Sequence, residues 1–251
     1  MTELLPILTS VILVSLISLV GIITLSLKKG VLDKILFILV AFAAGTLIGG
    51  AIFDLLPEAL ELGESLALQY ITVGIVVFFV IERFIHWKQH SHLLEHKDHT
   101  HEVKPYAYLN LVGEGIHNFL DGTIIAAAYL VSFELGIVAT IAIIFHEIPQ
   151  EIGDFGILVA GGFSPKKALG YNFLISLGAV AGALVMFFAA GLIPGLSLIM
   201  LSFAVGGFLY IALGNLLPEL HHETSSSKIL LQVVFLILGI VLLYYVGIVF
   251  P

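Results

Sequence analysis

Two polar segments, GEGIHNFLDG (residues 113–122) and HEIPQEIGD (residues 146–154), lie inside stretches of sequence that are otherwise almost wholly apolar. Charged groups within a bilayer cost roughly 2.5–3.5 kcal/mol each on insertion scales, so they usually mark a functional position. The two segments carry nine polar side chains: Glu114, His117, Asn118, Asp121, His146, Glu147, Gln150, Glu151 and Asp154. If the surrounding stretches span a membrane, these residues need a shared explanation.

The composition indicates that they do span a membrane. The 251 residues are 59% hydrophobic and 11% charged, and the mean hydropathy is +1.13. Soluble domains carry about 25% charged residues. This difference excludes an ordinary cytosolic enzyme, a nucleic-acid-binding protein and a disordered regulator. The chain has no cysteine, which excludes disulfides, thiolate nucleophiles and thiolate metal ligands.

Eight apolar stretches are long enough to cross about 30 Å of hydrocarbon, which takes about 20 helical residues. They cover residues 4–27, 35–56, 68–85, 107–131, 135–160, 168–192, 196–217 and 229–250. We therefore predict an all-α polytopic membrane protein with eight transmembrane helices. Because the connections are short, residues 1–251 are expected to form a single transmembrane domain in the lipid bilayer.

The charges predict the orientation of these helices. All ten Lys and Arg residues fall in alternate connections, after the first, third, fifth and seventh stretches. The opposite connections carry acidic residues such as Glu58, Glu61 and Glu64 and no basic residue. By the positive-inside rule, the basic connections are cytoplasmic and both termini are extracytoplasmic. We expect a multi-pass protein of a plasma or inner membrane.

The longest hydrophilic connection, residues 86–104, is predicted to be a His-rich cytoplasmic loop. Its histidines are His86, His90, His92, His96, His99 and His101. Such tracts can bind metal through composition alone, so the loop is an accessory metal-site candidate, with a solvated disordered segment as the alternative. His221 and His222, after the seventh stretch, are further accessory candidates.

The segments GGAIFDLLPEALE (residues 49–61) and GGFLYIALGNLLPELHHE (residues 206–223) resemble each other. One runs outward and the other inward, which favours an inverted repeat of spans 1–3 and 6–8 around spans 4–5, a common arrangement in secondary transporters. A shared helix-exit signal would also explain the similarity. Asp54 and Asn215, at matching positions, are candidates for lining an entrance or exit.

Helical geometry places the nine polar residues of segments 113–122 and 146–154 on one face of each helix. At about 100° per residue, those of residues 113–122 fall within an arc of about 100°, and those of residues 146–154 within about 140°. A tight turn near residues 132–134 makes the two helices antiparallel neighbours, so the polar stripes can face each other. Imidazole and carboxylate together suit zinc, with iron(II) and manganese as further options.

These motifs closely resemble those of the ZIP (Zrt/Irt-like) family of divalent metal transporters, in the subgroup with HNFxDG and HEIPxE. The resemblance implies import of divalent metal, chiefly zinc, towards the cytoplasm through a binuclear site between spans 4 and 5. It further implies a homodimer, and metal as substrate, without a catalytic cofactor. By motif position, it implies the metal ligands His117, Asn118, Asp121, His146, Glu147 and Gln150, with Glu151 adjoining.

Two residues depart from the family pattern. Many members have His where this chain has Gln150, and others have Glu. Some contribute a Glu from the sixth span, where Asn172 is the nearest polar residue here. Glu114, Asp154 and Asn172, together with Asp54 and Asn215, are expected to orient ligands or to line the pathway.

Three other functions compete with transport of metal. His146-Glu147 begins like the H-E-x-x-H helix of zinc proteases, which suggests an intramembrane zinc-dependent hydrolase, but Gln150 replaces the second His. Buried carboxylates alone would suit a proton or sodium antiporter, which would not need His117 and His146. A metal receptor without transport is the third. The sequence favours a gradient-driven transporter that is not an enzyme.

Overall fold

The computed structural model describes residues 3–24, 29–95, 103–221 and 223–249, and these residues form helices without any strand. The first half contains α1 (Leu4–Ile17), the 3-10 turn η1 (Ser18–Val20), α2 (Gly21–Thr24), α3 (Lys29–Gly49), the π-helix η2 (Gly50–Leu55), α4 (Leu56–Glu95) and α5 (Pro105–Val131). The second half contains α6 (Phe133–Ala160), α7 (Pro165–Ser176), α8 (Gly178–Ala190), α9 (Leu196–Tyr210), the π-helix η3 (Ile211–Leu216), α10 (Leu217–Leu220) and α11 (Ser226–Val249).

Six helical segments of the described chain are long and apolar enough to cross a membrane. They are Leu4–Ile23, Lys34–Arg83, Phe133–Ala160, Pro165–Ala190, Leu196–Leu220 and Ser226–Val249. This confirms an all-helical, multi-pass membrane protein, although the predicted number of spans was eight. The difference arises in two places. Lys34–Arg83 is 50 residues long and is interrupted at Gly63 (φ 170, ψ 86), and α5, with 27 residues, carries a polar stripe.

The segment predicted as a His-rich loop begins as a helix, because α4 continues to Glu95. His86, His90 and His92 lie on this extension, but their side chains are not among those described. His96, His99, His101 and His222 lie outside the described residues. The accessory metal site therefore stays a prediction.

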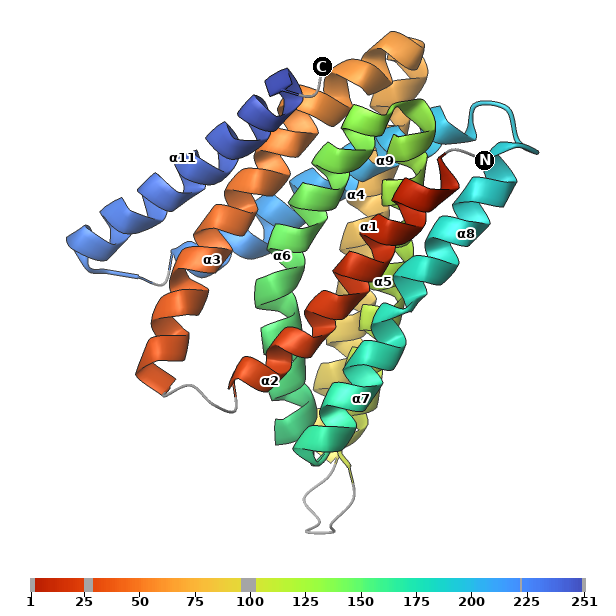
Figure 1. Cartoon of the computed structure of the whole chain (residues 1–251). Coiled ribbons are helices and arrows are strands. Elements are labelled where there is room, and N and C mark those ends of the chain that lie inside the picture. Colours follow the sequence, from red (N-terminus) through yellow and green to blue (C-terminus); the bar gives the residue numbers. More distant parts are fainter. Residues whose placement is uncertain (1–2, 25–28, 96–102, 222, 250–251) are drawn as a thin grey trace.

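Helices α5 and α6 pack against each other and are surrounded by α1, α3, α8 and α9 (Figure 1). Glycines allow the closest approaches in this bundle. A Cβ atom at Gly182 of α8 would overlap the Phe119 carbonyl of α5, and one at Gly45 of α3 would overlap the Leu236 carbonyl of α11. The close contact between Gly182 and Phe119 brings α8 against α5 directly beside the polar stripe of α5.

The two π-helices occur in the two segments that resemble each other in sequence. Each is followed by Leu-Pro-Glu, with Pro57 after η2 and Pro218 after η3. Proline lacks an N–H and its ring crowds the carbonyl four residues earlier, and a wider turn relieves that crowding. Asp54 and Asn215 occupy the matching fifth position of each π-helix. The segments thus share local geometry as well as sequence.

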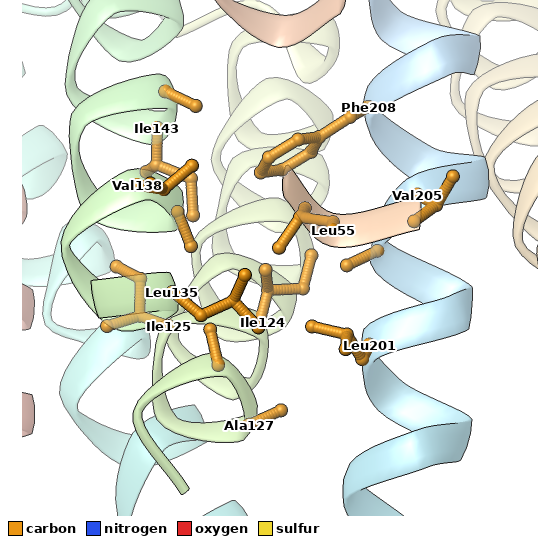
Figure 2. Close-up of a cluster of buried hydrophobic side chains, with 14 of the residues drawn as sticks. Leu55, Ile124, Ile125, Ala127, Leu135, Val138, Ile143, Leu201, Val205 and Phe208 are labelled. Atoms are coloured by element: carbon orange, nitrogen blue, oxygen red, sulfur yellow. The ribbon is translucent and has the colours of Figure 1, made fainter. Parts of the chain in front are cut away.

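Apolar side chains fill the space between α5, α6, α9 and η2 near the α5–α6 turn (Figure 2). We call this set the apolar cluster. It comprises Leu55, Ile124, Ile125, Ala127, Leu135, Val138, Ile143, Leu201, Val205 and Phe208, all buried. Ser132, the residue between α5 and α6, caps α6 by accepting a hydrogen bond from Leu135 N at 3.1 Å.

Candidate metal centre

The polar stripes of α5 and α6 face each other, as their spacing predicted. Four side chains converge between the two helices, two from each: His117 and Asp121 from α5, and His146 and Glu147 from α6. We call these four the four-residue centre. Asp121, His146 and Glu147 are fully buried, and His117 is partly exposed.

The donor atoms of the four-residue centre lie close to one another. His117 Nε2 lies 3.3 Å from His146 Nε2. The same atom lies 3.6 Å from Asp121 Oδ2 and 3.2 Å from Glu147 Oε1. His146 Nε2 lies 3.3 Å from Asp121 Oδ2 and 3.5 Å from Glu147 Oε1.

These separations match the edges of a zinc coordination tetrahedron. Zinc binds imidazole nitrogen and carboxylate oxygen at about 2.0–2.2 Å, so neighbouring ligand atoms in a tetrahedral site lie about 3.3–3.6 Å apart. The five distances between the donor atoms span 3.2–3.6 Å. Five of the six edges formed by two nitrogens and two oxygens therefore have the spacing that one tetrahedral cation requires.

The hydrogen bonds around the four-residue centre also suit a cation. Within the described chain, both carboxylate oxygens of Asp121 and both of Glu147 are buried without a hydrogen-bond partner. Such groups are costly to bury unless something compensates them. His146 Nδ1 lies 3.3 Å from the Ala142 carbonyl, which can only accept, and a proton on Nδ1 leaves the lone pair of Nε2 free to bind a cation.

A second group of carboxylates adjoins the centre and shares Glu147 with it. Oxygen atoms of Glu114, Glu147 and Glu151 lie within 4.8 Å of one another, and all three side chains are buried. Asn172, from α7, donates a hydrogen bond from Nδ2 to Glu151 Oε2. Asn172 therefore contacts one carboxylate of this second group, and its expected role in orienting a ligand stays a prediction.

Asn118 and Gln150 are turned towards Glu114. Asn118 Nδ2 donates to Glu114 Oε1 at 2.8 Å. Gln150 Nε2 lies 3.2 Å from Oε1 and 3.0 Å from Oε2 of the same carboxylate. Of the seven ligands expected from the motifs, four form the four-residue centre, Glu151 joins the second group, and these two amides contact Glu114.

A cavity of about 260 Å³ leads away from His117, on the side opposite the apolar cluster. Among the expected pathway residues, its wall contains Glu114, Asp154 and Asn215. It also contains three polar residues that sequence reasoning missed: Glu82, Asn110 and Tyr210. Asn110 Nδ2 donates to Asp154 Oδ1 at 2.8 Å, and Tyr210 is hydrogen-bonded to Glu82. Asn110 stands four residues before Glu114, so the helical period could have revealed it.

Asp54 and His221 lie elsewhere. A Cβ atom at Gly247 of α11 would overlap Asp54 Oδ1, so this carboxylate faces α11 and not the cavity. His221 lines a separate cavity of about 490 Å³ together with Glu223. Glu223 accepts a hydrogen bond from Lys228 Nζ at 2.8 Å, which holds the pKa of that carboxyl below its ordinary value.

Comparison with known proteins agrees with this geometry. Residues 4–104 and 86–247 match the family described as ZIP Zinc transporter. The chain belongs to this family. The resemblance seen in the two motifs is thereby confirmed, and the facing stripes of α5 and α6 are the part of this ZIP chain that carries those motifs.

Individual relatives are similar over much of the chain. Zinc transporter ZIP13 of Pongo abelii is 35% identical over 221 residues, covering 82% of this chain and 65% of that protein. Zinc transporter ZIP13 of Mus musculus is 32% identical over 245 residues, covering 82% and 68%. Zinc transporter zipt-7.2 of Caenorhabditis elegans is 37% identical over 150 residues, covering 58% and 32%. The chain thus spans from about a third to about two thirds of the length of these relatives.

Proposed function

We propose that this protein carries divalent metal cations, zinc foremost, across the membrane towards the cytoplasm, and that they bind at the four-residue centre on the way. The observation that carries this proposal is the set of five donor–donor distances of 3.2–3.6 Å. Two imidazoles and two carboxylates in tetrahedral spacing suit zinc better than manganese, which prefers octahedral oxygen sites. Iron(II) is the next candidate. Metal is the substrate, and no catalytic cofactor is required.

The chain is proposed to cross the membrane eight times as a single domain over residues 1–251. The break at Gly63 divides Lys34–Arg83 into two spans, and α5 supplies another, so the six apolar segments become eight. Figure 1 draws the start of α1 and the end of α11 near the same end of the bundle, as an even number of spans requires. The distribution of basic residues puts that end outside.

The cavity is the proposed exit to the cytoplasm. Its polar wall includes Glu82, beside Arg83, and Asn110, near Lys104, and these basic residues mark the cytoplasmic side. Asp154 and Asn215 complete this route. On the other side, the apolar cluster separates the four-residue centre from the outer face, so the protein faces inward.

The proposed inverted repeat indicates how the outward-facing conformation would form. Asp54 and Asn215 hold matching places in η2 and η3, and Asn215 lines the inner cavity. Exchange of conformation between the repeats would give Asp54 the corresponding place at the outer entrance. The His-rich segment and His221 would act as accessory acceptors of metal. A homodimer is expected from the family resemblance.

Position 150 favours transport over hydrolysis. A zinc-protease helix needs a second imidazole there. In this chain the Gln150 amide donates to Glu114 instead. The buried imidazoles of the four-residue centre likewise have no purpose in an antiporter that uses carboxylates alone.

Zinc uptake into proteoliposomes that contain a metal indicator tests the proposal. We expect saturable uptake by the wild type and its loss in His117→Ala/His146→Ala. The matched control is Thr140→Ala, which removes a buried polar side chain of α6 outside the centre and the cavity, and it should retain uptake. Equal uptake by the wild type and the double variant would refute the proposed route. Tight zinc binding without any uptake would indicate a metal receptor.

A further inference from the structure

The separate cavity that His221 lines lies between α10 and α11, and we call it the α11 cavity. Its volume of about 490 Å³ is within the usual range for pockets that hold small molecules, about 300–1,000 Å³. Most of its wall is aliphatic and comes from Leu217, Leu220, Ile229, Val233 and Leu236. Ile229 and Val233 are 42% and 44% exposed, so the cavity opens at the outer surface of α11. Because α11 is apolar enough to cross a membrane, lipid would surround this opening.

One polar side chain, Gln232, faces the α11 cavity from within the apolar part of the helix. It is 6% exposed, and its amide has no hydrogen-bond partner among the described residues. A primary amide carries two donors and one acceptor, and burial of such a group without a partner is costly. The cavity is therefore suited to an occupant that is mainly apolar and that offers a hydrogen-bonding group beside Gln232.

The order of side chains along α11 indicates which occupant this is. Lys228, Gln232 and Leu236 follow one another at intervals of four residues, so they lie on the same face with a rise of about 6 Å at each step. From the end of the helix inwards, this face presents a cation, an amide and an aliphatic side chain. A glycerophospholipid presents its phosphate, its ester carbonyls and its acyl chains in the same order.

The Lys228 ammonium is able to contact a phosphate at the membrane surface. Its side chain lies in the first turn of α11 and is 60% exposed. It donates one hydrogen bond to Glu223 Oε2 at 2.8 Å, which leaves two of its three N–H groups for another acceptor.

We propose that the α11 cavity binds a diester glycerophospholipid of the surrounding bilayer, with the phosphate at Lys228, an ester carbonyl at the Gln232 amide and an acyl chain along Leu236. A fatty acid would place its carboxylate at Lys228 and leave Gln232 without a partner. Inorganic phosphate would leave the aliphatic wall empty. Leu217 stands two residues after Asn215, so the lipid would pack against the same segment that lines the cavity beside His117.

The test is lipid binding to the purified full-length chain in detergent, measured by native mass spectrometry. The probes are dioleoyl phosphatidylethanolamine and its diether analogue, which has the same headgroup but no ester carbonyl. The wild type should bind one diester molecule about fivefold more tightly than the diether, the effect of one hydrogen bond between neutral groups. Gln232→Leu should bind both lipids equally, because leucine suits an apolar helix but cannot donate.

Gln69→Leu is the matched control, since Gln69 is an exposed glutamine of α4 outside the α11 cavity, and it should keep the preference for the diester. Lys228→Gln tests the phosphate contact. It should weaken binding of the phospholipid about fivefold and leave binding of dioleoylglycerol, which has no phosphate, unchanged.

The inference is overturned if the wild type binds no phospholipid, or if it binds the diester and the diether equally. A preference for the diester that persists in Gln232→Leu, or that is lost equally in Gln69→Leu, would overturn it as well. Displacement of the lipid by inorganic phosphate would show that the site is one for a free anion. None of these measurements involves zinc, so their failure would leave the proposed function standing.

Discussion

The same helices build both sides of the four-residue centre, one side from apolar side chains alone and the other from a mixture of polar and apolar side chains. Towards the α5–α6 turn, α5 contributes Ile124 and Ile125 to the apolar cluster. Towards its other end, the same helix contributes Asn110 and Glu114 to the wall of the cavity. Helix α9 shows the same change, from Leu201 and Val205 in the cluster to Tyr210 at the cavity.

This difference between the two sides indicates where the barrier to a cation lies. A charged ion can move through a water-accessible cavity whose wall offers polar groups, but it would lose its hydration in a packed apolar layer without replacement ligands. The four-residue centre stands at the boundary between the two environments, with the Phe208 ring 6.2 Å from the His146 ring, centroid to centroid. The proposed transport would therefore require the apolar cluster to separate while the cavity closes.

Removal of a ligand at the boundary should have the largest effect. His146→Ala deletes one of the two imidazoles and leaves Asp121 and Glu147 without that neighbour. Because loss of a group that merely orients a ligand costs up to about 100-fold in metal affinity, we expect a larger loss here. Isothermal titration with zinc measures it. An unchanged zinc affinity would show that His146 is not a zinc ligand.

The contrast between the two sides can be sharpened by thiol labelling, because the chain has no cysteine of its own. Asn215→Cys, in the exposed wall of the cavity, should react readily with a soluble maleimide, and Val205→Cys, in the apolar cluster, slowly. If exposing the buried position costs about 3 kcal/mol, the rates should differ by about 100-fold. Similar rates would mean that the cluster admits water as freely as the cavity.

A smaller effect is expected where one side chain orients another. Asn172→Ala removes the amide that donates to Glu151 Oε2. Zinc affinity should weaken by about tenfold, because Glu151 adjoins the expected ligands and losses of this type cost about 10–100-fold. Ser202→Ala serves as control, because this buried hydroxyl has no hydrogen-bond partner in the described chain. The same affinity in both variants would argue against a role for Asn172.

The smallest effect should come from the turn that joins α5 and α6. Ser132→Ala removes the cap that accepts from Leu135 N, which should lower stability by about 1 kcal/mol. A shift of the thermal unfolding midpoint in detergent measures this loss. Zinc affinity should not change, since Ser132 lies beyond the apolar cluster. A fall in zinc affinity would show that the two sides are coupled more tightly than the contrast implies.

Much of this contrast could be predicted from the sequence, because it depends on local pattern. The stretches 107–131 and 135–160 differ by two residues or fewer at each end from α5 and α6, since the turn at Ser132 and the apolar runs fix those ends. The facing stripes followed from helical period and antiparallel neighbours. His117, Asp121, His146 and Glu147 meet for that reason.

The remainder depends on contacts between distant segments. Glu82 and Tyr210 meet at the cavity from α4 and α9, and no local period relates them. The amide of Gln150 could have pointed at the metal, and its contact with Glu114 follows from how α5 and α6 are rotated against each other. The continuation of α4 to Glu95 was missed because polar residues can prolong a helix beyond the bilayer.

X-ray absorption of the zinc-loaded protein tests directly whether the four-residue centre holds the ion, because it reports the ligands around the bound zinc. We expect four ligands at about 2.0–2.1 Å, with multiple-scattering features from two imidazoles. These features should be absent in His117→Ala/His146→Ala. A wild-type spectrum of six oxygen ligands without imidazole, or the same spectrum in both proteins, would contradict a metal centre formed by His117, Asp121, His146 and Glu147.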